Sequence, residues 1–398
     1  MTWIHPIFIV ASFIGIVLSL ENGLGRTPPM GWNSWNHFGC NVDENLIKET
    51  ADALVKFGFA DAGYKYLNVD DCWEGERDEN GYLTSDPITF PNGMKMLADY
   101  AHSKRLLFGI YSDAGYYTCA KRVGSLGYEK KDAEIFASWG IDYLKYDNCN
   151  NDGSLEKQRY TKMRDALIAT GRPIFFSICE WGNSKPYLWG AEVGNSWRTT
   201  GDIRVAWDSI LSILRRQQAI TQYSRPGGWN DPDMLQVGNG QFSLDEQKSH
   251  FSLWAALKAP LLLGFDIRNP PNDTLKIVLN PEIIALNQDP LGKSVNIAQR
   301  SRFFDIWTGE LSDGHVALLF NRAEIAMTIT LDLKYHCKLE GEIFIRDLWE
   351  RKDLGYFTKS FTAKVPKHGI KVLKIKGGTP VNINESVFLQ HIEIYRYL

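Results

Sequence analysis

Short β-rich runs alternate with helical stretches along the first two thirds of the chain. Eight runs rich in β-branched, aromatic and aliphatic residues end in polar or charged residues. The stretches between them carry apolar residues at helical spacing, several with Asp or Ser near the start and Gly near the end. The predicted strands are 30–35, 64–71, 106–112, 142–147, 173–181, 196–202, 228–234 and 260–267, and the predicted helices are 43–58, 94–104, 130–140, 155–171, 205–218 and 243–259. This alternation predicts a (β/α)8 TIM barrel over residues 21–294.

The pattern changes after about residue 295. Runs at 294–299, 304–309, 315–321, 326–333, 342–349 and 370–375 alternate between apolar and polar residues, with turns and no helices between them. We therefore predict a C-terminal antiparallel β-sandwich domain at 295–378. The tail, 379–398, is given no role, although its segment "VFLQHIEIYRYL" has the composition of a further strand.

An apolar run, "WIHPIFIVASFIGIVLSL", occupies residues 3–20 and is near the lower length limit for a membrane span. Small residues at Val17 and Ser19 before the polar Glu21 favour a cleaved signal peptide at 1–20. No Lys or Arg precedes the run, so an uncleaved anchor remains the alternative. A signal peptide predicts the secretory pathway, ending outside the cell or in a lysosome or vacuole. Disulfides and glycosylation at the sequons Asn272 and Asn384 are then possible.

Composition narrows the function classes. The net charge is −3 and no basic run predicts nucleic-acid binding. No stretch after residue 20 is long and apolar enough to span a membrane. We therefore predict no stable association with a membrane. With eight His, no H-x-H or H-E-x-x-H and no C-x-x-C, we predict neither a metal site nor a cofactor. Thirteen Trp suit the flat faces of sugars, but also an ordinary core. The sequence does not determine the oligomeric state, and a homodimer is one assembly compatible with it.

Charged and polar residues recur where the predicted strands end, which is where TIM barrels carry their active sites. A single buried Asp there is more often a helix cap or a structural ion pair, because desolvating a charge is costly unless it is paired. Many on one face better fit a ligand with many hydroxyl groups. In strand order these residues are Trp35; Asp70 and Asp71; Tyr111 and Asp113; Lys145 and Asp147; Cys179, Glu180 and Trp181; Arg198 and Asp202; Trp229, Asp231 and Asp233; and Asp266.

The fourth and sixth strands are two positions apart in such a barrel. Their backbones should lie roughly 10 Å apart at the rim, given about 4.8 Å between neighbouring strands. Side chains of Asp147 and Asp202 reaching inward would leave roughly 5 Å between carboxyl groups, the separation typical of retaining glycosidases rather than inverting ones.

Seven motifs at barrel-like spacing together resemble the α-galactosidases of glycoside hydrolase family 27. They are "RTPPMGWNSWNHF", "NVDDCW", "GIYSDAG", "YLKYDNC", "ICEWG", "WRTTGDI" and "GGWNDPDML". The resemblance extends from about residue 23 to about residue 376. It implies a retaining enzyme that releases terminal α-D-galactose from oligosaccharides, galactomannans or glycolipids.

The resemblance also implies roles for individual residues. Asp147 is similar to the nucleophile and Asp202 to the general acid/base. Lys145 and Arg198 should keep Asp147 ionised, whereas Asp202 should start protonated. The residues that match galactose-binding positions are Trp35, Asp70, Asp71, Tyr111, Lys145, Glu180, Arg198 and Asp233.

The segment "CEWG" bears on specificity. Glu180 and Trp181 are expected to close the pocket where the C2 substituent of the sugar sits, with Glu180 accepting a hydrogen bond from the 2-hydroxyl. A structural ion pair between Glu180 and Arg198 is the alternative.

The resemblance pairs four of the six cysteines. Cys40–Cys72 and Cys119–Cys149 match disulfides of the family. Cys179 should then be a free thiol that lines the site, and Cys337 should be buried and unpaired.

Three other functions fit the sequence less well. An α-N-acetylgalactosaminidase shares the fold and the acid pair, but the bulk of Glu180 and Trp181 favours galactose. A catalytically inactive sugar-binding protein would not need both carboxylates. A metal-dependent barrel hydrolase lacks support from any metal-ligand spacing.

Overall fold

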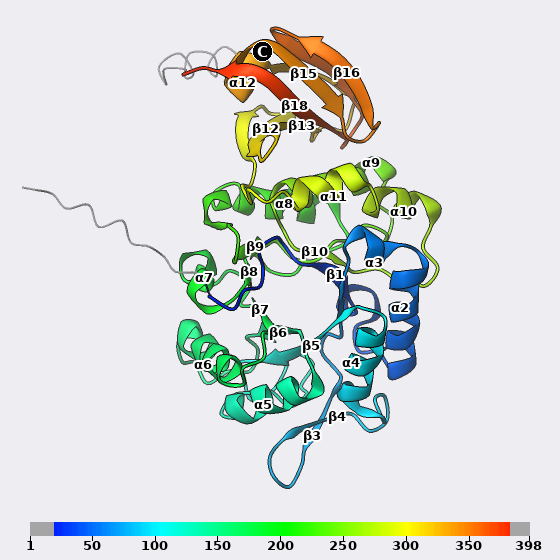
Figure 1. Ribbon diagram of the computed structural model, residues 1–398, viewed down its shortest axis with the longest axis vertical. Helices are drawn as coiled ribbons and strands as arrows, with labels where there is room; N and C mark the ends of the chain where they lie inside the picture. Colours follow the sequence, from blue (N-terminus) through cyan, green and yellow to red (C-terminus); the bar gives the residue numbers. More distant parts are fainter. Residues whose placement is uncertain (1–19, 383–398) are drawn as a thin grey trace, which may run out of the picture.

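The computed structural model describes residues 20–382 (Figure 1). A barrel with surrounding helices forms the larger part, and a β domain lies against one side of it. The predicted signal peptide, except for Leu20, lies outside the described residues, as do the sequon at Asn384 and most of the tail. Among residues 20–382, no helix is both long enough and apolar enough to cross a membrane.

All eight predicted barrel strands are present. They form one sheet with parallel neighbours in the order β10-β1-β2-β5-β6-β7-β8-β9. A parallel bridge from Leu235 to Leu263 connects the segment after β9 to β10. The strands are β1 Met30–Asn33, β2 Tyr66–Asn68, β5 Leu107–Asp113, β6 Tyr143–Asp147, β7 Phe175–Ile178, β8 Ser196–Arg198, β9 Trp229–Asp231 and β10 Leu261–Leu263.

Helices cover the outside of this sheet. Helix α2 begins after Asp43, whose side chain accepts from the Leu46 amide, and α9 begins with a reciprocal capping box between Ser243 and Glu246. The barrel helices are α1 Trp35–Phe38, α2 Glu44–Lys56, α3 Phe59–Ala62, α4 Gly93–Ser103, α5 Glu129–Trp139, α6 Glu156–Ala169, α7 Gly190–Val193, α8 Trp207–Gln217, α9 Leu244–Ala256, α10 Asn272–Val278 and α11 Pro281–Asn287, with 3-10 turns η1 Pro186–Leu188 and η2 Thr221–Tyr223.

Most barrel strands are shorter than predicted. The prediction ran into polar residues whose backbone leaves the ladder to form the rim loops. After β2, for example, the Asp70 amide donates to Ser34 Oγ at 3.0 Å instead of to a neighbouring strand. A hairpin of β3 Glu74–Arg77 and β4 Leu83–Ser85 was not predicted and follows this turn.

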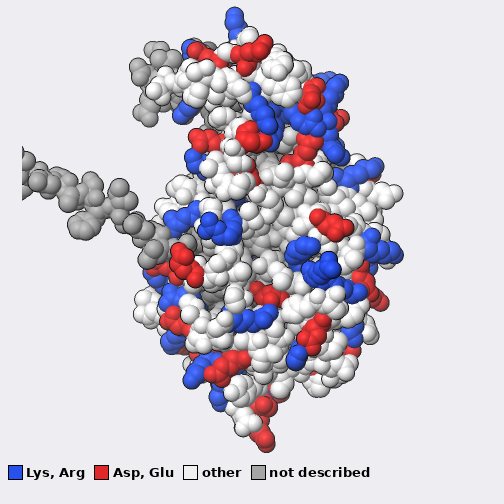
Figure 2. Space-filling view, in the orientation of Figure 1, with Lys and Arg blue, Asp and Glu red and all other residues white. Residues whose placement is uncertain are grey.

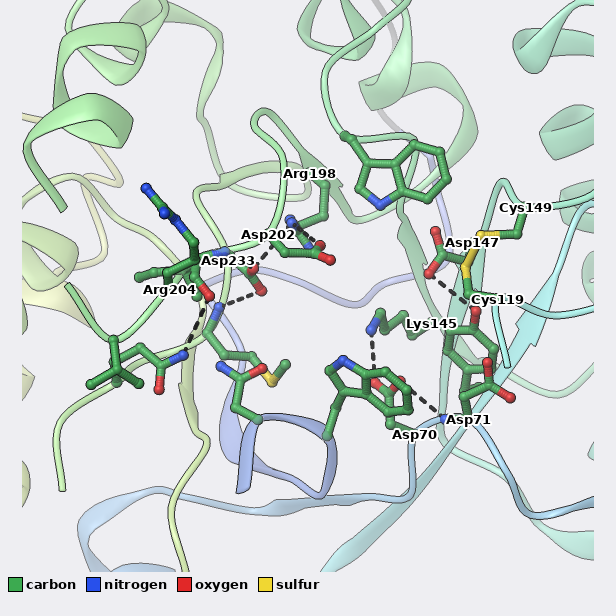
Figure 3. Close-up of a pocket in the computed structure, with 18 residues that line it drawn as sticks. Asp70, Asp71, Cys119, Lys145, Asp147, Cys149, Arg198, Asp202, Arg204 and Asp233 are labelled. Atoms are coloured by element: carbon green, nitrogen blue, oxygen red, sulfur yellow. Dashed lines mark hydrogen bonds and ion pairs between the residues drawn. A yellow bond between two sulfur atoms is a disulfide. The ribbon is translucent and has the colours of Figure 1, made fainter. Parts of the chain in front are cut away.

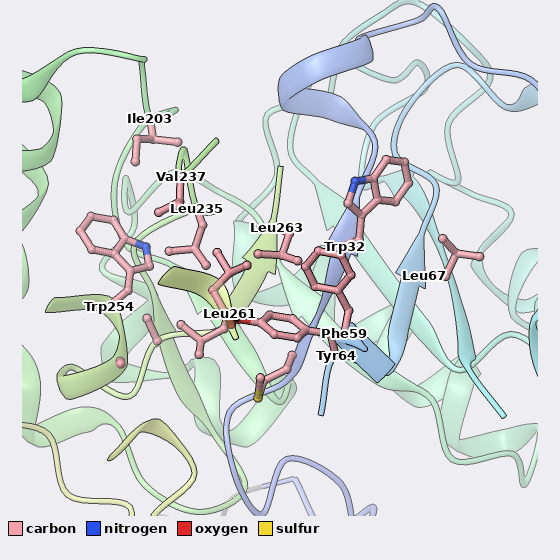
Figure 4. Packing of buried hydrophobic residues seen from close by; sticks show 14 of the residues in the cluster. Trp32, Phe59, Tyr64, Leu67, Ile203, Leu235, Val237, Trp254, Leu261 and Leu263 are labelled. Carbon is pink, nitrogen blue, oxygen red and sulfur yellow. Dashed lines mark hydrogen bonds between the residues drawn. The ribbon is translucent and has the colours of Figure 1, made fainter. Parts of the chain in front are cut away.

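Large apolar side chains fill the space between the sheet and the helices (Figure 4). Trp32, Tyr64 and Leu263 are fully buried there, and the Trp32 indole donates to the Phe265 carbonyl at 2.8 Å. The Trp254 indole of α9 donates to the Asp233 carbonyl at 2.8 Å. This contact from the core therefore fixes the backbone of Asp233, which the sequence analysis placed in the site.

The C-terminal domain is the predicted antiparallel sandwich. A six-stranded sheet, β11-β12-β13-β18-β15-β16, packs against the two-stranded sheet β14-β17. One detail was wrong: a short helix, α12, lies within a region predicted to lack helices, because the Asp332 side chain caps it by accepting from the Tyr335 amide. The elements are β11 Asn296–Arg300, β12 Phe304–Leu311, β13 Gly314–Asn321, β14 Met327–Asp332, α12 Leu333–Cys337, β15 Leu339–Asp347, β16 Lys352–Phe357, β17 Ser360–Val365 and β18 Ile370–Pro380.

The two domains share one apolar cluster. Val316, Leu318 and Phe320 of β13 belong to the same buried cluster as the barrel core. Arg346 of β15 adds a bidentate contact to Glu282 of α11, at 2.8 and 2.7 Å. On the face shown in Figure 2, acidic and basic side chains are interspersed.

Candidate active site

A cavity of about 550 Å³ opens where the barrel strands end (Figure 3). Loops that follow most of the barrel strands contribute its walls, so residues far apart in sequence meet there. The lining residues are Trp35, Asn36, Asp70, Asp71, Tyr111, Cys119, Lys145, Asp147, Cys149, Trp181, Arg198, Asp202, Ile203, Arg204, Val205, Asp233, Met234 and Gln236.

Asp147 at the end of β6 forms one wall. Its side chain is held by two bonds: the Tyr111 hydroxyl donates to Oδ2 at 3.1 Å and the Asn148 amide donates to Oδ1 at 3.0 Å. Burial raises the pKa of Asp147 to about 6, although the charges of Lys145 and Arg198 act to lower it. Desolvation outweighs these two cations, but they limit the rise, so Asp147 is still mainly ionised at pH 7.

Asp70 and Lys145 form a buried ion pair beside Asp147. Lys145 Nζ lies 2.7 Å from Asp70 Oδ2, which also accepts from Asn33 Nδ2 at 2.8 Å. Burial alone would lower the pKa of Lys145, but the adjacent Asp70 carboxylate raises it above its ordinary value. The Lys145 ammonium group is therefore held in place between the carboxylates of Asp70 and Asp147.

Asp71 is oriented by backbone amides. Its Oδ2 accepts from the Ala120 amide and its Oδ1 from the Cys72 amide, both at 2.8 Å. Burial raises the pKa of Asp71 and the backbone bonds partly offset that effect. The turn at Cys72 has a φ of 84°, an uncommon value for a non-glycine residue.

Arg198 connects two carboxylates on the opposite wall. Its Nη2 lies 3.0 Å from Asp202 Oδ1 and 3.0 Å from Asp233 Oδ2. Burial acts to raise the pKa of Asp202, but the guanidinium outweighs it and lowers the pKa below the ordinary value. The sequence analysis expects Asp202 to start protonated, and this shift is in the opposite direction because Arg198 stabilises the carboxylate.

The segment "CEWG" is arranged differently from its prediction. Trp181 lines the cavity, but Glu180 and Cys179 are buried outside the lining. Glu180 Oε2 accepts from the amide and hydroxyl of Ser184, at 2.6 and 2.9 Å, so its carboxylate is directed into its own loop. Neither a contact with a 2-hydroxyl nor the alternative ion pair with Arg198 is therefore supported.

The Cys179 thiol lies behind the wall rather than in it. Its Sγ is 3.7 Å from Arg198 Nη1. Burial raises the pKa of this thiol well above its ordinary value, so it stays protonated.

The two disulfides that the resemblance implied, Cys40–Cys72 and Cys119–Cys149, are present. Cys179 and Cys337 are buried free thiols, as expected. The Cys119–Cys149 bridge itself lines the cavity, a role that the sequence analysis did not assign. These sulfurs lie near Asp113, but bonded to each other they are not thiolate ligands for a metal.

The sequence analysis also missed several lining residues. Asn36 and Met234 lie within the quoted motifs, and Arg204, Val205 and Gln236 lie just after them, but none of the five carried a separate signal. Conversely, Asp113, Trp229, Asp231 and Asp266 stand at strand ends without lining the cavity. Burial and the charge of Asp147 raise the pKa of Asp113 to about 9, which keeps this neighbour of Asp147 neutral at ordinary pH.

Comparison with known proteins gives a consistent result. Residues 27–289 match the family model described as alpha galactosidase A, and residues 302–375 match the alpha galactosidase C-terminal beta sandwich domain. An alpha-galactosidase from Cyamopsis tetragonoloba is 51% identical over 356 residues, which cover 88% of this chain and 87% of the relative.

Solved structures agree with this match. Alpha-galactosidase I from Mortierella vinacea superposes with a TM-score of 0.88 at 40% identity, covering 91% of this chain and 100% of that one. The alpha-galactosidase from Saccharomyces cerevisiae, solved with raffinose, gives a TM-score of 0.85 at 33% identity, covering 89% and 98%.

The raised pKa of Asp147 predicts a pH-dependent stability effect. The folded chain binds this proton more tightly than the unfolded chain, since the pKa rises from 3.8 to about 6. Stability is therefore lost as the pH rises from about 4 to 6, by about 3 kcal/mol in total. Asp147→Asn removes this loss, so it should raise the melting temperature at pH 7 and have little effect below pH 4. Asp208→Asn, at an exposed site, is the control. A lower melting temperature for D147N at pH 7 would contradict the assignment.

Proposed function

The chain belongs to the alpha-galactosidase family, glycoside hydrolase family 27, and we propose that it releases terminal α-D-galactose by a retaining double displacement. The observation that carries this proposal is the placement of Asp147 and Asp202 on facing walls of one cavity, among side chains suited to sugar hydroxyls. Two carboxyl groups that face the scissile bond are what glycosidases of either stereochemistry require. The retaining course is taken from the resemblance of Asp147 to a nucleophile.

In the first step, an Asp147 oxygen attacks the anomeric carbon while the bond to the leaving oxygen breaks. Asp202 donates its proton to that oxygen, and galactose becomes esterified to Asp147. Tyr111 and the Asn148 amide hold the Asp147 carboxylate in one orientation, which favours attack along a defined line. In the second step, water attacks the same carbon, Asp202 takes its proton, and the ester bond breaks.

Arg198 lets Asp202 change protonation state. A sugar over the cavity would desolvate the Asp202 side chain, which is 73% exposed, and desolvation raises the pKa of a carboxyl group. Arg198 can then remain paired with Asp233 alone, at 3.0 Å. We infer that Asp202 acquires its proton as the substrate binds.

The remaining polar groups of the cavity suit the hydroxyls of galactose. Asp70, Asp71 and Asp233 offer carboxylate acceptors, and Lys145 and Arg198 offer donors. Trp35 provides an apolar face on which a sugar ring can stack. Both members of the acid pair are present, which favours an enzyme over an inactive binding protein.

Trp181 is the observation that favours galactose over its N-acetylated analogue. It is the one bulky side chain of the "CEWG" segment that lines the cavity. We infer that it occupies the space that an acetamide at C2 would need.

A secreted location is part of the proposal. The chain is tied to the barrel from residue 20 onward, since the Leu20 amide donates to the Ala191 carbonyl at 2.7 Å and Asn22 Nδ2 donates to Asn195 Oδ1 at 2.9 Å. Removal of residues 1–19 would leave both contacts in place. Removal of residues 1–20 would lose the Leu20 contact and keep that of Asn22. Two disulfides and an exposed sequon at Asn272 are compatible with an oxidising secretory route.

The mechanism predicts the effect of removing the nucleophile. Asp147→Asn should lower kcat on p-nitrophenyl α-galactoside by about 10²–10⁴-fold or more, because the attacking oxygen is lost. Asp99→Asn, at an exposed position of α4 away from the cavity, should stay near wild type. Proton NMR of the first-formed sugar should show α-galactose. Initial formation of β-galactose would exclude a double displacement.

Specificity should depend on Trp181 and not on Glu180. Trp181→Ala should raise the kcat/KM ratio of α-N-acetylgalactosaminide to α-galactoside by about tenfold, within the range for filling or emptying an apolar pocket. Glu180→Gln is the matched control and should leave the ratio unchanged, since Glu180 does not line the cavity. A wild-type preference for the N-acetyl substrate would refute the galactosidase assignment.

Secretion predicts a processed N-terminus. Protein recovered from the medium of a eukaryotic host should begin at or next to Leu20 or Glu21 by N-terminal sequencing. Asn272→Gln should remove one enzyme-sensitive glycan, seen as a mass shift. Retention in the membrane fraction with Met1 intact would instead support the uncleaved anchor.

A further inference from the structure

A second cavity, of about 530 Å³, lies where the barrel meets the β domain and shares no lining residue with the candidate active site. Helices α9 and α10 form its barrel side, and the turn after β15 forms the other side (Figure 1). We propose that this junction cavity, lined by Leu244, Lys276 and Trp349 among others, binds the first sugars of an N-linked glycan attached to Asn272. The inference rests on the proposed secretory route and goes beyond it, because it gives the glycan a binding site on its own chain.

Asn272 stands at the rim of the junction cavity. It is exposed and is the first residue of α10, and the next residue, Asp273, lines the cavity. Lys276 lines it as well, and residues four apart lie on one face of a helix, with about 5–6 Å between their Cβ atoms. A glycan on Asn272 therefore begins next to the cavity. The covalent tether raises the effective concentration of its sugars there, so weak contacts suffice for binding.

Trp349 provides a surface on which a sugar ring can stack. Its indole Nε1 donates to Ser252 Oγ of α9 at 2.9 Å, which fixes the orientation of the ring. The side chain is only partly buried and lines the cavity. A sugar ring presents C–H groups on one face, and a fixed aromatic ring can bind that face with little further loss of side-chain freedom.

Polar groups near Trp349 suit N-acetylglucosamine, the sugar that is attached to asparagine. Lys248 Nζ lies 5.4 Å from the centre of the Trp349 ring, and no carboxylate lies within ion-pair distance of it among residues 20–382. Its ammonium group can therefore donate to an oxygen of the sugar. The carboxylates of Asp273 and Glu350 can accept from hydroxyl groups and from the acetamide N–H.

Leu244 adds an apolar contact. It is the first residue of α9, is 48% exposed and lines the cavity beside Ile277. Covering it with the acetyl methyl and ring C–H groups of a sugar removes apolar surface from water, which is favourable. The cavity volume also falls within the range of about 300–1,000 Å³ that is typical of small-ligand sites.

A glycan in the junction cavity would contact both domains. Leu244 belongs to a barrel helix, whereas Trp349 belongs to the turn between β15 and β16. The turn is already held against the barrel, because Asn280 Nδ2 donates to the Leu348 carbonyl at 3.1 Å. The sugars therefore bind across a preformed junction, and their contacts should stabilise the folded protein.

The test measures how much the glycan stabilises the protein with the cavity intact and with it altered. Wild type and Asn272→Gln are produced in a eukaryotic secretory host, and we expect the glycan to raise the melting temperature by about 2–4 °C. The same comparison in a Trp349→Ala background should give about half that difference or less. Leu244→Ser should also reduce the difference, and its half-exposed position tests the cavity even if Trp349→Ala fails to fold.

A glycan at another exposed turn is the matched control. Thr358→Asn creates a sequon with Lys359 and Ser360 between β16 and β17, at the end of β16 remote from Trp349. The effect of that glycan on the melting temperature should not depend on Trp349→Ala. Hydrogen exchange gives a second measurement: a glycan on Asn272 should slow exchange in residues 348–351, and a glycan at position 358 should not.

The outcomes separate this inference from the proposed function. Secreted wild type that carries no glycan on Asn272 by mass spectrometry would overturn the inference alone. A glycan effect that is the same in wild type, W349A and L244S would also overturn it. Wild type that stays in the cell without a glycan would overturn the secretory route and the inference together. Failure to hydrolyse p-nitrophenyl α-galactoside would overturn only the galactosidase proposal, since the binding of the glycan does not depend on catalysis.

Discussion

The site depends on keeping several carboxylates close together in a poorly solvated cavity. Each buried carboxylate favours its neutral form unless a cation or hydrogen-bond donors stabilise the charge. Lys145 and Arg198 supply positive charge on opposite walls, and backbone amides supply donors to Asp71 and Asp147. The extent to which these cations and donors offset the cost of burying a carboxylate differs from one residue to the next. In this structure the pKa of Asp147 is near 6, that of Asp113 near 9 and that of Asp202 below its ordinary value, so similar side chains differ in charge. The proposed acid role of Asp202 therefore requires its pKa to rise when substrate binds.

Rigid supports make this arrangement possible. The barrel ladder fixes where β5 and β6 end, so that Asp113 and Asp147 lie in register. The Cys119–Cys149 disulfide then connects the loops that follow these two strands. On the other wall, the Trp254 indole holds the Asp233 carbonyl from the core, and the Asp233 side chain binds both Arg198 and the Ile203 amide. Like-charged groups stay together because their backbones cannot move apart without disrupting the core.

The sequence predicts the scaffold and the position of Asp147 and Asp202 at the rim well, for a physical reason. Barrel strands need continuous apolar runs, and their polar ends mark the rim, so Asp70, Lys145, Asp147 and Asp202 could be placed before the structure was known. The direction in which a side chain at the rim points is harder to predict from the sequence. Glu180 is adjacent to Trp181 in sequence, yet only Trp181 lines the cavity, because a positive φ of 58° at Trp181 turns the chain and Ser184 captures the Glu180 carboxylate. Lining residues on rim loops, such as Arg204, follow no periodic pattern and so gave no signal.

Under the proposed mechanism, the loop after β8 carries the proton donor and a part of the cavity wall. In that mechanism Asp202 provides the proton. The Ile203 amide anchors the loop to Asp233, and Arg204 and Val205 line the cavity directly after it. Arg198 binds Asp202 and Asp233 at equal distances, so a shift in its pairing toward Asp233 frees Asp202 without releasing the loop. In the same mechanism, a substrate over the cavity removes solvent from Asp202, and that desolvation raises its pKa toward the protonated form. Under the proposed mechanism, contacts with the leaving group would therefore promote the proton transfer that expels it.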